Sequence, residues 1–319
     1  MLDAALLFPA ISDLTIEGYQ WISLSGGEPV LYPPLPALLQ HAKGQGLRTA
    51  MVSNGMLLTP RQLDRIQPNL DLLVLSVDGK PESHNLMRGS EQAFELMASR
   101  LPDLRERGIP FGFIFTLTQH NLDELPWVAE FAANSGARLL QIHPLEDYGN
   151  AARRLRGKVP DATEGAYAWI LGKQIHDRLK DRMAVHLDLI HSSVAERSPE
   201  LIYAGHQEPD EAAGLAQLIS PLVIEPDGAV VPLQYGFSRQ LAVGHLAEAR
   251  LGSLAKRWRK QRWPTFRALC RALRDDIAAA PEPTFLNWYE RIADKAADAL
   301  GQPLALPQGR QGGAPELAG

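Results

Sequence analysis

The chain has 319 residues, a formal net charge of −5, 45% hydrophobic residues and 22% charged residues, which allows one large domain or a domain with an extension. The weakly acidic charge argues against a general affinity for nucleic acid or for an anionic membrane surface. No apolar run is long enough to span a bilayer, and the N-terminus lacks the basic flank of a secretory signal. The single cysteine, Cys270, excludes an internal disulfide framework. We therefore expect a cytoplasmic protein.

The first half of the chain alternates strand-like apolar runs with helical patterns. Strands are predicted at Gln20–Leu24, Arg48–Ser53, Leu72–Val77, Phe111–Leu117 and Arg138–His143. Helices are predicted at Leu2–Leu14, Pro34–Gln45, Pro60–Ile66, Glu91–Arg107 and Leu122–Ser135. Repeated alternation of this kind predicts an α/β fold in which parallel strands are joined by right-handed crossovers.

The pattern changes after residue 150, and we expect an α+β extension over residues 151–255. This extension contains a helix at Ala162–Arg182, a candidate strand at Ala184–Ile190 and a hairpin at 222–233. Residues 256–300 are predicted to form C-terminal helices. Residues 301–319 are rich in Gly, Pro and Gln and are predicted to form a disordered tail.

Small polar or charged residues follow five consecutive predicted strands. They are Ser25-Gly26-Gly27-Glu28-Pro29, then Ser53-Asn54-Gly55, then Ser76-Val77-Asp78-Gly79 with Arg88 beyond, then Thr116, Thr118 and Asn121, and finally His143. Ligands of parallel α/β folds bind at the carboxyl ends of the strands, so we predict a site here. Thr116, Thr118 and Asn121 are expected mainly to hydrogen-bond within their loop. For His143 both a core position and a position facing the cavity stay open.

The first three of these strand ends suit the parts of one ligand. Gly26 and Gly27 lack Cβ atoms, so a ligand can approach the backbone there. The carboxylate of Glu28 suits an ammonium group, which has only donors. Asp78 suits a ribose diol, and Arg88 suits a carboxylate through a two-pronged contact. An amine, a ribose and a carboxylate together describe an amino-acid nucleoside such as S-adenosylmethionine.

These residues also resemble a known family. Gly26-Gly27-Glu28-Pro29 resembles the GGE motif of radical S-adenosylmethionine proteins, and Ser53-Asn54-Gly55 is similar to that family's Thr-Asn-Gly. Ser76-Val77-Asp78-Gly79, followed by Arg88-Gly89, resembles the next strand of the family and the arginine after it. The resemblance implies that residues 1–150 form a partial parallel (β/α)6 TIM-like barrel, here without its first strand. It further implies the cofactor-binding residues Gly26, Gly27, Glu28, Pro29, Ser53, Asn54, Ser76, Asp78 and Arg88.

The family also requires a [4Fe–4S] cluster held by Cys-x3-Cys-x2-Cys. This motif is absent from the sequence, whose one cysteine lies late in the chain. Two explanations stay open: the protein begins further upstream, or it is a cluster-free relative. We favour the first because cofactor-type residues persist at the other strand ends. A barrel without its first strand would also expose an unpaired edge.

The hairpin region carries a second resemblance. Val223–Leu233, followed by Gly244-His245-Leu246, resembles the hairpin of the SPASM/Twitch extension, in which a cysteine follows the proline. Leu233 stands in the place of that cysteine, so we expect no auxiliary cluster. We expect the hairpin to serve as a lid over the substrate.

The resemblance implies an iron–sulfur oxidoreductase in which a 5′-deoxyadenosyl radical removes hydrogen from a substrate. The SPASM-like hairpin points to a peptide substrate, and such an enzyme would need an electron donor as partner. The alternative is a cluster-free, non-catalytic binding or accessory protein on the same barrel. An ordinary barrel lyase or aldolase ranks below both, because the strand ends show neither a lysine nor paired carboxylates.

Overall fold

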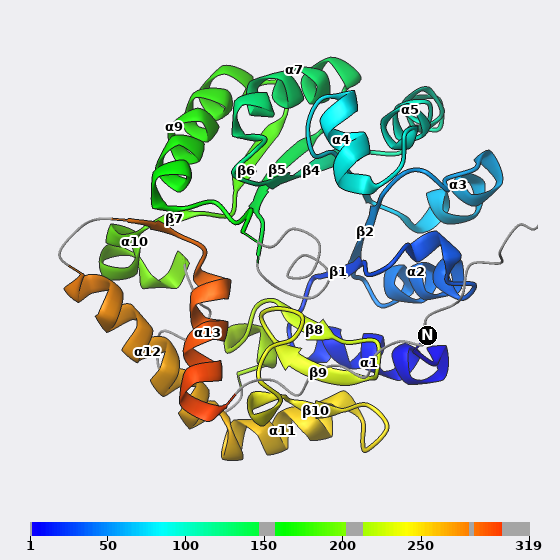
Figure 1. Ribbon diagram of the computed structural model, residues 1–319. Helices are drawn as coiled ribbons and strands as arrows, with labels where there is room; N and C mark the ends of the chain where they lie inside the picture. Colours follow the sequence, from blue (N-terminus) through cyan, green and yellow to red (C-terminus); the bar gives the residue numbers. More distant parts are fainter. Residues whose placement is uncertain (1, 147–156, 202–212, 281–283, 302–319) are drawn as a thin grey trace, which may run out of the picture.

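The structure is a computed structural model that describes residues 2–146, 157–201, 213–280 and 284–301. Within these residues, one sheet holds six parallel strands in sequential order (Figure 1). They are β1 (Trp21–Leu24), β2 (Arg48–Ser53), β3 (Leu72–Ser76), β4 (Phe111–Leu117), β5 (Leu139–Pro144) and β6 (Ala184–Leu187). This parallel sheet with its covering helices is the partial TIM-like α/β barrel that the sequence predicts.

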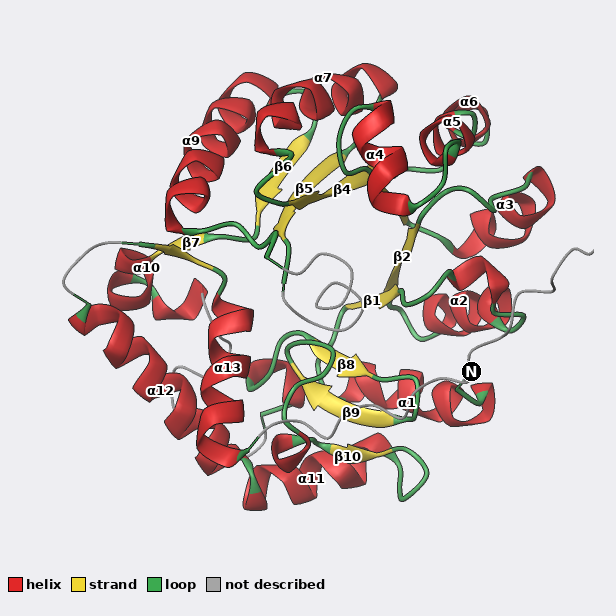
Figure 2. Ribbon diagram, in the orientation of Figure 1, coloured by secondary structure: helices red, strands yellow, loops and turns green. Residues whose placement is uncertain are grey.

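The helices of this part precede or connect the strands. They are α1 (Ala4–Ile16), α2 (Leu35–Gly44), α3 (Pro60–Ile66), α4 (Pro81–Arg88), α5 (Ala93–Ala98), α6 (Leu101–Glu106), α7 (Leu125–Ser135) and α9 (Ala162–Leu179). Figure 2 shows the sheet as an open arc, with α2, α3, α7 and α9 on its outer side. Thr59 caps α3 with a reciprocal hydrogen-bond pair to Gln62, which confirms the helix start predicted there.

The two faces of the sheet differ in polarity because side chains alternate along each strand. One face packs against the outer helices through buried apolar side chains, among them Leu75, Phe113 and Leu140. On the inner face, the register aligns Thr116 of β4 with His143 of β5. The inner face near the carboxyl ends is therefore polar, whereas the outer face forms an apolar core.

The structure differs from the predicted helices where prolines interrupt them. The predicted helix Glu91–Arg107 is divided into α5 and α6, and α6 has Pro102 in its first turn. The predicted C-terminal helical region starts earlier than residue 256 and is divided into α11 (Leu251–Gln261) and α12 (Trp263–Ala279), the latter with Pro264 in its first turn. Proline lacks an N–H group and clashes with the preceding turn, so it starts a helix but does not continue one.

The parallel sheet extends beyond the predicted boundary at residue 150. The strand β6 pairs in parallel with β5, and α9 is the crossover helix that covers them. The candidate strand at Ala184–Ile190 is thus β6 of the barrel, followed by the two-residue strand β7 (Ile190–His191). Of the predicted tail, residues 302–319 lie outside the described residues.

The C-terminal part packs as a second layer beside α1. The predicted hairpin is confirmed as β8 (Leu222–Ile224) and β9 (Ala229–Pro232), with β10 (Gly244–His245) added antiparallel to β9. The remaining elements are α10 (Ser192–Arg197), β11 (Phe285–Leu286), which pairs with β7, and α13 (Trp288–Leu300). Figure 1 shows α1 beside β8, β9 and α11, far from them in sequence.

Two ion pairs fasten α1 to α11 and the residue before it. The carboxylate of Asp13 accepts from Arg250 at 2.5 Å, and that of Glu17 accepts from Arg259 at 2.7 Å. Both carboxylates are nearly inaccessible, so loss of either arginine would leave a buried charge without its partner. Leu233 is buried and has a φ of 66°, an unusual conformation for leucine, and its side chain packs in the same core as α1.

None of the helices in the described residues is of a length and apolarity that would cross a membrane.

We predict that Gly112→Ala destabilises the barrel, because a Cβ at this position of β4 would lie 2.7 Å from the backbone oxygen of Leu139 in β5. The free energy of unfolding should fall by about 1–3 kcal/mol, as for other overpacked sites. Urea denaturation measures this change. Gly44→Ala is the matched control, since its Cβ would meet nothing within 4 Å. Equal stability of the Gly112→Ala variant and the parent would contradict the packing described for β4 and β5.

Candidate functional site

The carboxyl ends of β1 and β2 are tied together by the carboxylate of Glu28. Its Oε1 accepts from the Ser53 hydroxyl at 2.8 Å, and its Oε2 accepts from the Asn54 backbone N–H at 3.0 Å. The two strands are adjacent and parallel, so their ends meet at the same edge of the sheet. Three of the predicted site residues, Glu28, Ser53 and Asn54, are therefore in direct contact.

The two glycines before Glu28 leave an open stretch of backbone. Gly26 and Gly27 are exposed, have φ values of 90° and 52°, and a Cβ built on either would meet nothing within 4 Å. Their left-handed conformation favours glycine, and the space beside them is free. Pro29 is buried and begins a short 3-10 helix at Pro29–Leu31, which fixes the exit of this loop. A ligand can thus lie against the backbone with Glu28 at its side.

The end of β3 carries a buried ion pair. Asp78 is 1% exposed, and its carboxylate accepts from Arg88 Nε at 2.5 Å and from Arg88 Nη2 at 3.0 Å. His84 Nδ1 lies 3.3 Å from the same carboxylate. Burial alone would raise the pKa of Asp78, but the hydrogen bond from His84 and the charge of Arg88 outweigh it and lower the pKa.

This arrangement bears on two predicted cofactor contacts. Asp78 faces Arg88 and His84, so its predicted contact with a ribose stays a prediction. Arg88 comes from α4, a helix that the sequence analysis did not predict, and its side chain is 29% exposed. Ser76, at the last position of β3, is buried at the same edge.

Asn121 joins the ends of β3 and β4. Its Nδ2 donates to the backbone oxygens of Asp78 at 2.9 Å and of Thr116 at 2.8 Å, and its Oδ1 accepts from the Thr118 N–H at 2.7 Å. The side chain is 2% exposed, so every contact is internal. The expectation that Asn121 hydrogen-bonds within its loop agrees with this geometry.

A second polar group lies at the carboxyl ends of β5 and β6. Asp188 Oδ2 accepts from His143 Nδ1 at 2.8 Å and from Gln141 Nε2 at 2.6 Å. His143 Nε2 lies 3.6 Å from Glu146 Oε1, and Glu146 in turn accepts from Asn287 at 2.7 Å. The side chain of His143 is 31% exposed on the inner face, which decides between the two positions left open for it.

The charges around His143 alter its titration. Burial alone would lower the pKa of His143, but the hydrogen bond and charge of Asp188 outweigh it, with help from Glu146 and Glu290, and the pKa is raised. The sequence analysis missed Asp188, Glu146 and Asn287. Their positions depend on the pairing of β6 with β5 and on the return of α13 to the barrel, which no local motif signals.

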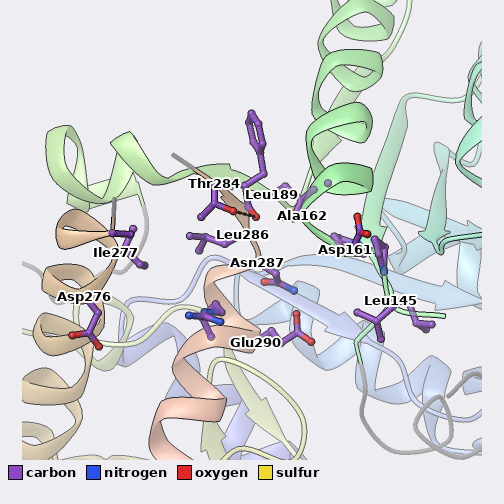
Figure 3. A pocket seen from close by; sticks show the side chains of 17 residues that line it. Leu145, Asp161, Ala162, Leu189, Asp276, Ile277, Thr284, Leu286, Asn287 and Glu290 are labelled. Carbon is purple, nitrogen blue, oxygen red and sulfur yellow. Dashed lines mark hydrogen bonds between the residues drawn. The ribbon is translucent and has the colours of Figure 1, made fainter. Parts of the chain in front are cut away.

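A cavity of about 330 Å³ opens beside this group, between the end of β5, the start of α9, and α12 and α13 (Figure 3). Its walls include Leu145, Ala162, Ile277, Leu286, Asn287 and Glu290. Figure 3 shows that these side chains belong to segments that are far apart in the sequence. The volume lies at the lower end of the range for small-molecule sites and suits one or two amino-acid side chains.

The residues present do not provide a site for a [4Fe–4S] cluster. Among the described residues, no group of three or more His, Cys, Asp or Glu side chains is placed to hold a metal ion. The sequence contains one cysteine, Cys270, so it cannot supply three thiolates. Cys270 is buried in α12, and burial raises the pKa of its thiol. It acts as a small apolar side chain of the core.

Comparison with known proteins finds similarity to one family. Residues 10–132 match the model of the Radical SAM superfamily. PqqA peptide cyclase of Ruegeria pomeroyi is 28% identical over 233 residues, which is 72% of this chain and 59% of that protein. The chain thus spans about three fifths of the length of that curated relative.

Two solved structures share the fold. Streptococcus suis SuiB bound to S-adenosylmethionine superposes with a TM-score of 0.64 at 13% identity, covering 83% of this chain and 61% of that one. The structure titled anSMEcpe with bound AdoMet gives a TM-score of 0.61 at 15% identity, covering 94% of this chain and 88% of that one. Both structural superpositions extend beyond residue 150, so they include part of the C-terminal layer as well as the barrel.

We predict that Asp78→Asn destabilises the protein at neutral pH by about 3–5 kcal/mol, because a buried Arg88–carboxylate pair is broken. The depressed pKa of Asp78 gives a stabilisation that is complete above the ordinary carboxyl pKa of about 3.9 and is lost as the pH falls through the folded value. The difference in the free energy of unfolding between the parent and the variant should therefore become smaller at acidic pH.

Urea denaturation of both proteins at neutral and acidic pH measures this difference. Asp177→Asn is the control, since Asp177 forms an exposed pair with Lys173 and should change little at either pH. A constant stability difference at all pH values would show that the charge of Asp78 is not what the variant loses.

Proposed function

We propose that this chain binds S-adenosylmethionine at the carboxyl ends of β1, β2 and β3, and that it is a radical S-adenosylmethionine enzyme acting on a peptide. The observation that carries the proposal is the open Gly26-Gly27 backbone beside Glu28, whose carboxylate is held by Ser53 and Asn54. A rigidly held carboxylate beside a bare backbone suits the ammonium group of an amino acid.

The other residues at this edge suit the rest of the cofactor. Pro29 and Ser76 shape the edge, and the guanidinium of Arg88 is oriented by its two hydrogen bonds to Asp78. Arg88 would face the cofactor carboxylate with its remaining donors. Asp78 and the ribose hydroxyls form a further proposed contact, which would require the Asp78 carboxylate to turn partly from Arg88.

When bound together with a reduced [4Fe–4S] cluster, S-adenosylmethionine supplies a 5′-deoxyadenosyl radical that removes a hydrogen atom from a substrate. The residues of this sequence do not hold such a cluster, so no step through it is derived from them. The side chains at β1 to β3 bind and orient the cofactor. The polar residues of β5 and β6, with the cavity beside them, face the place where a substrate would lie.

The names of the similar proteins support a peptide as the substrate class. PqqA peptide cyclase is named for a peptide, and SuiB has been solved with the precursor peptide SuiA. The cavity at the end of β5 is lined by apolar residues such as Leu145 and Leu286 together with polar residues such as Asn287 and Glu290, as expected for a site that holds part of a peptide.

A non-catalytic binding protein on the same barrel is the second candidate. One observation favours it: the sequence has a single cysteine, which is buried in α12. Both candidates share the binding of S-adenosylmethionine. They differ in iron content and in cleavage of the cofactor, which only the enzyme would show.

We predict that Glu28→Ala raises the dissociation constant of S-adenosylmethionine by about 10- to 150-fold, the effect of losing one hydrogen bond to a charged group, about 1.5–3 kcal/mol. Equilibrium dialysis with labelled cofactor measures the constant. Glu28→Gln is the matched variant, because it keeps the side-chain length and one acceptor oxygen while it removes the charge and the second acceptor. It should lose most of the same affinity. Unchanged binding in both variants would contradict the proposed site.

A further inference from the structure

His143 and the cavity beside it form a unit that cofactor binding does not use. His143 is the last inward-facing residue of β5, and Pro144 and Leu145, which follow it directly, line the cavity. Asn287 lines the cavity and donates to Glu146, which lies 3.6 Å from His143 Nε2. The Glu146–Asn287 pair therefore links the imidazole to one wall of the cavity.

Asp188 determines which ring nitrogen is available. A carboxylate has no proton to donate, so the 2.8 Å contact requires that His143 Nδ1 carry the hydrogen. Gln141 Nε2 donates to Asp188 Oδ2 at 2.6 Å, and the Asp188 backbone N–H donates to the Ile142 backbone oxygen at 2.9 Å. Two hydrogen bonds thus fix the Asp188 carboxylate and a third fixes its backbone. Nε2 of the neutral ring is left with a lone pair, and the His143 side chain is 31% exposed.

We propose that His143 is a proton-transfer residue for a peptide held in this cavity, with Asp188 as the residue that positions it. An N–H or O–H bond of the peptide breaks, the electron pair stays on the peptide nitrogen or oxygen, and the proton passes to His143 Nε2. The imidazolium that forms is stabilised by Asp188 Oδ2, as in other histidine–carboxylate pairs. This inference rests on the proposed function, since it takes the substrate to be a peptide.

The groups that face His143 favour proton acceptance. They are Asp188 after β6, Glu146 after β5 and Glu290 on α13, with His186 of β6 on the far side of Asp188 at 3.3 Å. The three carboxylates outnumber the two histidines, and they raise the pKa of His143. No charged residue of β4 faces the ring, since its register partner there is Thr116. A stronger base at a partly open position is suited to taking a proton from a substrate.

Acylation by diethyl pyrocarbonate, which attacks neutral imidazole nitrogen, tests the geometry without any cofactor. The extent of reaction at each histidine is measured by mass spectrometry across the pH range around 6.5, where imidazole titrates. His143 should react, and the midpoint of its reaction should lie above the ordinary imidazole pKa of about 6.5. Asp188→Asn should lower this midpoint, because it removes the charge that raises the pKa.

Two control variants make this test specific. Asp177→Asn removes an exposed charge on α9 and should leave the midpoint of His143 unchanged. Ala162→Trp fills the cavity and should slow acylation of His143, whereas Thr163→Trp, one position along α9 and outside the cavity lining, should not. The proposal would be overturned if His143 did not react, or if the pH midpoint of its reaction were the same in the parent and in Asp188→Asn.

Conversion of peptides tests the catalytic role. The protein is isolated from its source cells with its cofactors, a digest of source-cell proteins is the peptide probe, and mass-shifted products are quantified. His143→Gln should lower product formation by about 100-fold or more and remove the limb of the pH profile that belongs to the imidazole. Unchanged S-adenosylmethionine binding in this variant separates its effect from failure of the proposed function. Product formation equal to that of the parent, with the same pH profile, would overturn the assignment.

Discussion

Parallel pairing of consecutive strands is the constraint on which the rest of the structure depends. Because β1 to β6 are parallel and in sequential order, the residues that follow each strand lie at the same edge of the sheet. Residues separated by tens of positions, such as Glu28 and Asn54 or His143 and Asp188, are thereby brought into hydrogen-bond contact. The covering helices keep the outer face apolar, so the polar side chains are restricted to the inner face and the edge.

Polar groups along this edge fall into two sets with different roles. At β1 to β3, the side chains hold one another and leave bare backbone open, which suits binding of a cofactor by its amino-acid part. At β5 and β6, a histidine held by Asp188 lies next to Glu146, whose partner Asn287 lines a cavity; we propose that this set acts on a substrate. Between the two sets, Asn121 joins the ends of β3 and β4.

The sequence predicted the parts of this site that depend on local pattern. The strand ends were recognisable because small residues and an acid follow apolar runs, and the contact of Glu28 with Ser53 and Asn54 follows from adjacent parallel strands. The pairing of Asp78 with Arg88 was not predicted, because it requires α4, a helix of only eight mostly polar residues. The pair His143–Asp188 depends on β6, because the two residues are 45 positions apart and α9 lies between them. Pro102 and Pro264, which start α6 and α12, are local signals in the sequence for the breaks that divide the predicted helices.

Hydrogen–deuterium exchange with and without S-adenosylmethionine tests the central claim most directly, because it reports where along the chain the cofactor binds. The account predicts slower exchange in the segments that follow β1, β2 and β3, which contain Gly27, Asn54 and Gly79, and little change in α12 and α13. Protection confined to the C-terminal helices, or no protection at a saturating concentration of cofactor, would contradict it.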